Sequence, residues 1–236
     1  MSLFKACLDL VLPPHCLGCD LPGVALCETC RQTLTQERQV PACKRCGGRA
    51  GLHGADRCAA CRRRPPRFDG ISRVAPDGGL LGELLRTYKF QNDLRLEPFL
   101  ARMVTYTAMR AHWFRDIDCV ACVPTHWMRR MTRPIYPAER FGKRLAGSAG
   151  LPSVTALRRR KRGRRQVGLS WSARRANVRN TFVVTLSKRI AGKTVLIVDN
   201  VATTGSTLSA CAGALKRAGA AKVYAAVLLR VDSRRR

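Results

Sequence analysis

A run of small and hydroxyl-bearing residues follows an acidic residue in the C-terminal third of the chain. Asp199, Asn200 and Val201 are followed by Ala202, Thr203, Thr204, Gly205, Ser206 and Thr207. Backbone N–H groups and hydroxyls in such a loop can donate hydrogen bonds to an anion, and glycine permits a close backbone approach. The chain contains neither G-x-x-x-x-G-K-[ST] nor G-x-G-x-x-G. These residues therefore predict an anion-binding loop that is neither a Walker A loop nor a dinucleotide fingerprint.

The residues on either side of this loop predict the elements that hold it. Val195–Val198 is an uninterrupted apolar run, which is typical of a strand buried on both faces. The pattern from Leu208 to Ala218 indicates a helix with Gly219 as its C-cap. The loop would then join the carboxyl end of a strand to a helix N-terminus. Open α/β sheets bind ligands at that place, and the helix dipole favours an anion there.

The stretch from Lys193 to Leu208 resembles the phosphoribosyl pyrophosphate (PRPP) signature of type I phosphoribosyltransferases. The resemblance implies that residues 202–207 hold the 5-phosphate of PRPP and that Mg²⁺ accompanies the substrate. It also implies that the acidic pair of the signature, here Asp199 and Asn200, contacts the ribose hydroxyls as the catalytic positions. The second acidic residue of the family is replaced by Asn200. Pro124 and Thr125 are in register with the pyrophosphate-binding loop of the family.

Four C-x-x-C pairs near the N-terminus predict two structural zinc sites. They are Cys16/Cys19, Cys27/Cys30, Cys43/Cys46 and Cys58/Cys61. Each pair can supply two thiolates to a tetrahedral Zn²⁺, so eight ligands suit two ions. Few apolar residues lie between the pairs, which favours folding around metal, and disulfides are uncommon in the cytosol. Sequential sharing of the pairs, as in a double zinc ribbon, is the simplest arrangement, and an interleaved arrangement stays open. Cys119 and Cys122 share the spacing but fall in a predicted strand, where they would face opposite sides.

The charge of the chain indicates a polyanionic partner. The formal net charge is +29, and sixteen Lys or Arg but no acidic residue lie between Arg140 and Val198. Cations of one sign at this density repel one another, so we expect the stretch to meet nucleic acid, preferably single-stranded DNA. The residues expected to contact it from a mobile loop at 157–180 are Arg158, Arg159, Arg160, Lys161, Arg162, Arg164 and Arg165, with Trp171 as a stacking residue.

The overall pattern predicts an α/β fold in which helices flank a parallel sheet, with an N-terminal Cys-rich zinc-ribbon module. The charged, proline-bearing linker at 62–67 marks the boundary, which gives an N-terminal helix and double zinc ribbon at 1–66 and a phosphoribosyltransferase-like domain at 67–236. The predicted strands are Phe68–Pro76, Asp118–Pro124, Thr181–Val184, Val195–Val198 and Val223–Leu229. The predicted helices are Leu80–Tyr88, Glu97–Trp113, Pro137–Ala146 and Leu208–Ala218. No apolar run reaches the roughly 20 residues of a membrane span, so we expect a cytoplasmic protein.

A second set of motifs is similar to the ComF family. Gln166–Ser170, Arg174–Val178 and Phe182 match its pattern, and Tyr88-Lys89-Phe90 occurs at the expected place. The turn after Arg133 departs from it. The resemblance implies a competence-associated role in DNA uptake or utilisation, with DNA-uptake or recombination proteins as partners and PRPP or a related 5-phosphate as ligand. The alternative is an active Mg²⁺-dependent phosphoribosyltransferase that displaces pyrophosphate from PRPP onto an unknown acceptor.

Overall fold

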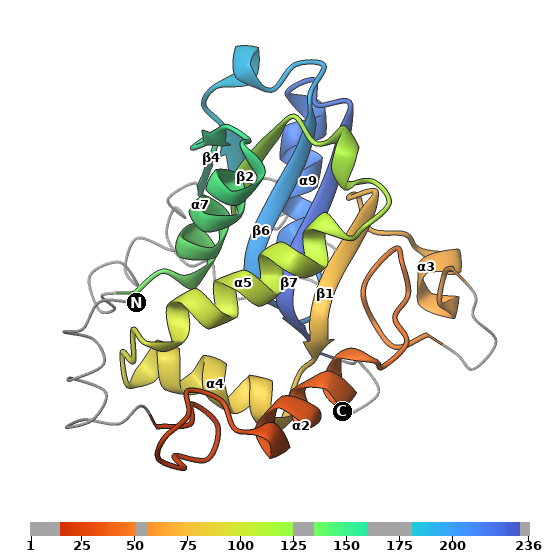
Figure 1. Ribbon diagram of the computed structural model, residues 1–236. Helices are drawn as coiled ribbons and strands as arrows, with labels where there is room; N and C mark the ends of the chain where they lie inside the picture. The colour runs from red at the N-terminus through yellow and green to blue at the C-terminus, as the bar shows by residue number, and fades with distance from the viewer. Residues whose placement is uncertain (1–14, 51–55, 125–134, 160–180, 232–236) are drawn as a thin grey trace, which may run out of the picture.

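The computed structural model describes residues 15–50, 56–124, 135–159 and 181–231, and within these residues five parallel strands form the main sheet. The strand order is β1-β7-β6-β2-β3 (Figure 1). The strands are β1 (Gly70–Pro76), β2 (Cys119–Cys122), β3 (Ser153–Val154), β6 (Thr194–Ala202) and β7 (Lys222–Arg230). Every neighbouring pair is parallel, which confirms the predicted α/β class.

Helices cover both faces of the sheet, so its central strands are buried on both sides. Figure 1 shows α5 crossing one face and α9 lying behind the other. The helices of the first face are α4 (Gly79–Phe90), α5 (Leu96–Met109) and α7 (Pro137–Ala149), and the second face carries α9 (Ser206–Arg217). Leu196 and Val198 of β6 belong to the first apolar cluster, whereas Val195 and Ile197 belong to the second. This alternation explains why the strand carries no polar residue from 195 to 198.

Several predicted boundaries differ from those in the structure. Strand β6 continues past Val198 to Ala202, so Asp199 and Asn200 lie in the strand rather than after it. Helix α5 ends at Met109, four residues before the predicted end at Trp113. The chain turns there, which places Trp113 on the ring of Tyr224 with centroids 4.5 Å apart. Helix α7 runs on to Ala149, where Gly150 with a φ of 66° ends it.

The stretch around residue 157 is also more ordered than predicted. Leu157–Arg159 forms β4, which pairs antiparallel with β5 (Phe182–Val184) in a small separate sheet. The expectation of a loop beginning at 157 was therefore wrong for its first residues. Residues 160–180 lie outside the described part of the chain. Leu157 and Phe182 are both buried against the α9 side of the main sheet, which accounts for the pairing.

The cysteine-rich segment contributes two helices, of which α2 contacts the sheet domain. Helix α2 (Glu28–Arg38) packs beside α4, and α3 (Ala59–Arg63) lies farther out on the β1 side of the molecule (Figure 1). The predicted N-terminal helix falls within residues 1–14, outside the described residues. No helix in the described ranges is long and apolar enough to cross a membrane.

Glu37 of α2 caps the first turn of α4. Its carboxylate accepts hydrogen bonds from the N–H groups of Leu80 and Leu81 at 2.7 and 3.2 Å. Gly79, with a φ of 60°, leaves room for that carboxylate, since a Cβ at this position would collide with it. A carboxylate at a helix N-terminus satisfies open N–H groups and complements the helix dipole. The cap therefore fixes α2, and with it the first cysteine cluster, on the sheet domain.

We expect Glu37→Ala to lower the free energy of unfolding by about 1–2 kcal/mol, since two helix N–H groups lose their acceptor. Glu83→Ala, which removes an exposed carboxylate from α4 itself, is the matched control. Urea denaturation of both variants measures the difference. Equal stability of the two variants would contradict a capping role.

Candidate functional site

The predicted anion loop lies between the central strand and α9. Strand β6 ends at Ala202, and α9 begins at Ser206. Gly205 has a φ of 75°, a left-handed conformation that favours glycine and turns the chain into the helix. The Thr204 hydroxyl donates to the Ser206 hydroxyl at 2.8 Å and accepts from the Ser206 N–H at 3.3 Å. The loop thus presents hydroxyls and N–H groups at a helix N-terminus, an arrangement that can bind a phosphate.

Asp199 lies at the edge of this loop and carries a perturbed carboxyl group. Its Oδ1 accepts a hydrogen bond from the Asn200 N–H at 2.8 Å. Burial raises the pKa of Asp199 to about 6, against the opposing effects of that hydrogen bond and of the positive charge of Lys89. A carboxyl group with such a pKa gains or loses its proton near neutral pH, a property often found at functional sites. The positive charge of Lys89, at the C-terminal end of α4, thus acts on the Asp199 carboxyl group.

Strand β2 brings a second predicted segment to the same edge of the sheet. Cys122 pairs in register with Val198, and the Val123 N–H donates to the Val198 carbonyl at 3.0 Å. Pro124 follows directly and is half-buried. The carboxyl ends of β2 and β6 therefore adjoin, as the predicted pairing of a pyrophosphate loop with a phosphate loop requires. Thr125 lies outside the described residues.

Arg230, at the end of β7, connects the loop to the cysteine-rich segment. Its side chain is 7% exposed. Nη1 donates to the carbonyls of Ala202 and Val231 at 3.0 and 2.8 Å, and Nε donates to the Cys46 carbonyl at 2.9 Å. One buried guanidinium thus joins the start of the loop to a cysteine of the second cluster. Sequence reasoning missed this residue, since an arginine at a strand end carries no signal of its partners.

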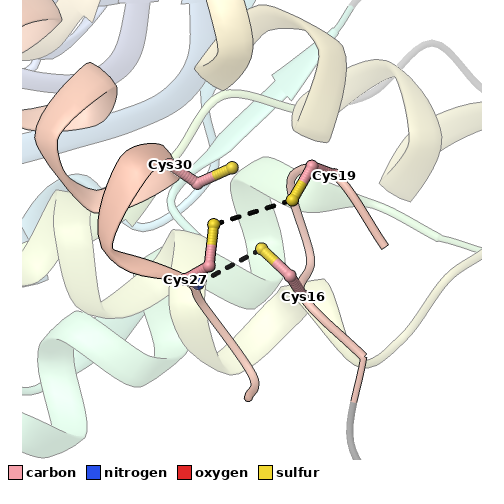
Figure 2. A group of neighbouring side chains, drawn as sticks. All are labelled: Cys16, Cys19, Cys27 and Cys30. Carbon is pink, nitrogen blue, oxygen red and sulfur yellow. Dashed lines mark hydrogen bonds between the residues drawn. The ribbon is translucent and has the colours of Figure 1, made fainter. Parts of the chain in front are cut away.

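Among the described residues, the eight predicted metal ligands gather into two groups of four. They are Cys16, Cys19, Cys27 and Cys30 (Figure 2), and Cys43, Cys46, Cys58 and Cys61. The structure therefore has the sequential arrangement rather than the interleaved one. In each group the sulfur atoms lie within 4.8 Å of one another.

The spacing and surroundings of the sulfur atoms fit a tetrahedral zinc. Zn–S bonds of about 2.3 Å place neighbouring sulfurs about 3.8 Å apart. The distances are 3.6 Å between Cys19 and Cys27 and 3.7 Å between Cys46 and Cys58. Burial alone would raise the pKa of the Cys16 thiol, but N–H groups of Cys27 and other residues donate to its sulfur and lower the pKa to about 6. The geometry therefore suits zinc thiolates, and the two clusters are Cys₄ zinc-binding sites.

The remaining C-x-x-C pair does not form a cluster. Cys119 packs on the α9 side of the sheet. Cys122 points toward Gly142 of α7 on the other side. The two sulfur atoms face opposite sides of β2, which confirms the expectation that they do not share a metal.

Only the first two of the predicted nucleic-acid contacts lie in the part of the chain that the structure describes. Arg158 and Arg159 are exposed on β4, and the Arg159 guanidinium lies 5.8 Å from the centre of the Phe182 ring. The other predicted contacts, Arg160, Lys161, Arg162, Arg164, Arg165 and Trp171, lie outside the described residues.

Comparison with known proteins identifies two domains and a group of relatives. Residues 7–62 match the double zinc ribbon domain, and residues 137–236 match the phosphoribosyl transferase domain. The chain is 28% identical over 215 residues to competence protein F of Haemophilus influenzae, covering 89% of this chain and 92% of that protein. It is also 28% identical over 233 residues to the DNA utilization protein YhgH of Escherichia coli, covering 94% and 99%.

Two solved structures are also similar to the chain. Glutamine PRPP amidotransferase from B. subtilis aligns with a TM-score of 0.41 and 21% identity, over 55% of this chain and 26% of that one. Adenine phosphoribosyltransferase from Leishmania tarentolae aligns with a TM-score of 0.41 and 10% identity, over 64% and 88%.

We expect the purified chain to carry two zinc ions, measurable by elemental analysis. Cys43→Ser should leave one, because it removes a ligand from the second cluster only, and binding free energies of about 10–16 kcal/mol depend on the full ligand set. Cys122→Ser, outside both clusters, is the matched control and should keep two. A wild-type content below one zinc per chain would contradict the assignment.

The raised pKa of Asp199 has a consequence for stability. Between its ordinary value of 3.8 and about 6, the unfolded chain releases a proton that the folded chain keeps, so the contribution of Asp199 to stability falls as pH rises through this window. Asp199→Asn should therefore raise the free energy of unfolding by up to about 3 kcal/mol at pH 7.5, since the pKa is raised from 3.8 to about 6 and each pKa unit corresponds to about 1.4 kcal/mol. The gain should shrink toward pH 4. Denaturation at several pH values, with the exposed Asp77→Asn as control, tests this, and a gain independent of pH would contradict it.

Proposed function

We propose that the chain is a member of the ComF family, which joins a double zinc ribbon to a phosphoribosyltransferase domain, and that it acts in DNA uptake or utilisation. In this proposal it binds PRPP or a related 5-phosphate at the β6–α9 loop and single-stranded DNA elsewhere on its basic surface. The zinc module of residues 1–66 and the domain of residues 67–236 act together in the cytoplasm, with DNA-uptake or recombination proteins as partners. Relatives named for competence and DNA utilization match about nine-tenths of the chain or more, which supports the proposal.

The observation that carries the ligand assignment is the meeting of a carboxylate and a donor-rich loop at the end of β6. The 5-phosphate would accept hydrogen bonds from residues 203–207 at the N-terminus of α9. Asp199 at the loop edge would accept hydrogen bonds from the ribose hydroxyls, and Asn200 follows it in the same strand. The pyrophosphate would lie toward Pro124 and Thr125.

A Mg²⁺ ion would fit this arrangement. Mg²⁺ is usually held by one or two carboxylates together with substrate phosphates, and Asp199 supplies one carboxylate at the edge of the loop. The ion would neutralise phosphate charge when it arrives with PRPP. The residues of the chain would bind the phosphate and orient the ribose.

The DNA assignment rests on charge. A net charge of +29 exceeds what a pocket for one phosphorylated sugar requires. Arg158 and Arg159 are exposed within the acid-free stretch, and further basic residues follow them in the sequence from Arg160 to Arg165. Neutralising phosphates with such a surface gives strongly salt-dependent binding with little sequence preference.

An active phosphoribosyltransferase is the second candidate, and Asp199 favours it. A carboxylate at this place would stabilise the positive charge that develops on the ribose during transfer. Asn200 offers one acceptor and no charge where the family signature has a second carboxylate. Hydrogen bonds to charged groups contribute roughly 1.5–3 kcal/mol against about 1 for neutral ones, so Asn200 should reduce turnover more than binding.

We therefore expect the wild-type chain to bind PRPP with Mg²⁺ and to release pyrophosphate slowly or not at all. Asn200→Asp should raise any transfer rate by about tenfold, corresponding to about 1.4 kcal/mol, with little change in PRPP affinity. Asp199→Asn should weaken both. Calorimetry with PRPP and a pyrophosphate-release assay over a panel of bases and amines measure the two quantities.

Gln36→Glu adds the same charge at an exposed position of α2 and controls for net charge. Absence of PRPP binding by the wild type would overturn the ligand assignment. Fast release of pyrophosphate by the wild type would favour the second candidate, an active phosphoribosyltransferase.

A further inference from the structure

An exposed aromatic ring on α5 is surrounded by guanidinium groups. Tyr106 is 52% exposed, although it is a large hydrophobic residue. The guanidinium carbons of Arg38 and Arg110 each lie 5.5 Å from the centre of its ring. Arg110 also donates to the tyrosine hydroxyl at 3.4 Å. Arg38 comes from the zinc-ribbon helix α2 and the other two residues from the sheet domain, so the two parts of the chain build this group together.

The ring lies at a cavity of about 370 Å³ between α2, β1 and α5. Besides Tyr106, three arginines line it, namely Arg38, Arg73 and Arg110. Over the residues that the structure describes, the lining contains no carboxylate. Arg73 is held from within the fold, because its Nη2 donates to the carbonyls of Val40 and Pro41 at 3.0 and 3.3 Å. The lining therefore combines a buried, hydrogen-bonded arginine with an exposed aromatic ring.

These features suit a nucleotide better than a simple phosphate. Three positive charges around one cavity repel one another, and an anion relieves that repulsion. A phosphate alone cannot stack on the tyrosine ring, whereas a base can. Guanidinium planes also stack on bases. A duplex keeps its base faces covered by neighbouring base pairs, so only a single strand offers both a phosphate and an open base face here.

We infer that this cavity is a subsite for single-stranded DNA, in which Tyr106 stacks on a base while Arg38 and Arg110 contact the flanking phosphates. The inference rests on the DNA-binding part of the proposed function and gives it a location separate from the β6–α9 loop and from the basic stretch at 158–165. Thr35 and Gln39 line the same cavity and can form hydrogen bonds with the edge of a base without selecting one base over another. Binding at the subsite is therefore tolerant of sequence.

Binding of a fluorescently labelled oligo-dT 20-mer and of a duplex of equal length tests the subsite. Tyr106→Ala should weaken single-strand binding about tenfold, the loss expected when one base loses its stacking partner. Tyr106→Phe keeps the ring and should bind within about twofold of wild type, so it separates stacking from the hydroxyl contact. Duplex binding should change little in either variant. Zinc content and thermal unfolding establish that each variant is folded.

The arginines are tested by the salt dependence of binding. Arg38→Ala with Arg110→Ala should lower the slope of log K against log salt concentration by about 1.4, since each single-strand phosphate contact contributes about 0.7. Arg115→Ala with Arg86→Ala removes two charges from other positions and should leave the slope as in the wild type.

The outcomes separate this inference from the proposed function. A wild-type chain that binds no single-stranded DNA overturns the DNA-binding part of the proposed function and the subsite with it. A wild type that binds, together with a Tyr106→Ala variant that binds equally well, overturns the subsite alone. An equal loss for Tyr106→Phe, or an equal loss of duplex binding, also overturns it, because stacking on the ring would then not explain the effect.

Discussion

Burial of β6 on both faces is the constraint on which the other features depend. Alternate side chains of residues 195–198 enter two different apolar clusters, so the strand can neither rotate nor shift its register by one residue without moving each set into the wrong cluster. The position of its carboxyl end follows from that packing. Asp199, Asn200 and the loop to α9 are therefore positioned by the core, and local hydrogen bonds such as that from Arg230 to the Ala202 carbonyl add to it. A loop placed in this way can use its hydroxyls and N–H groups for a ligand.

Local patterns in the sequence were enough to predict the elements that carry these features. The unbroken apolar run at 195–198 predicted a doubly buried strand, and the C-x-x-C spacing predicted two four-cysteine sites. Both signals lie within a few residues, so no knowledge of distant contacts was needed. The left-handed glycines at 150 and 219 end helices α7 and α9, but only the second was predicted. Gly147 precedes Gly150 in the sequence but lies within helix α7 and does not end it.

Features that depend on distant partners could not be predicted in this way. Strand β4 pairs with β5 across more than twenty intervening residues, and arginine-rich residues at 158 and 159 gave no sign of a strand. Tyr106 has Arg38 as a neighbour only because α2 packs against β1. Glu37 caps a helix that begins more than forty residues later. In each case the two residues in contact are far apart in the sequence, so only the fold shows that they meet.

The hydrogen bond from Arg230 to the cysteine-rich segment bears on whether the zinc ribbon can be exchanged between related proteins. Its acceptor in the cysteine-rich segment is the backbone carbonyl of Cys46, not a side chain. Any donor ribbon that reproduces the metal-binding turn would present the same oxygen, whatever its surface residues. A chimera made with a ribbon from a distant relative can therefore retain this bond. A truncated chain that begins after the ribbon would instead lose this acceptor, and water would have to take its place at the Arg230 Nε beside the β6–α9 loop.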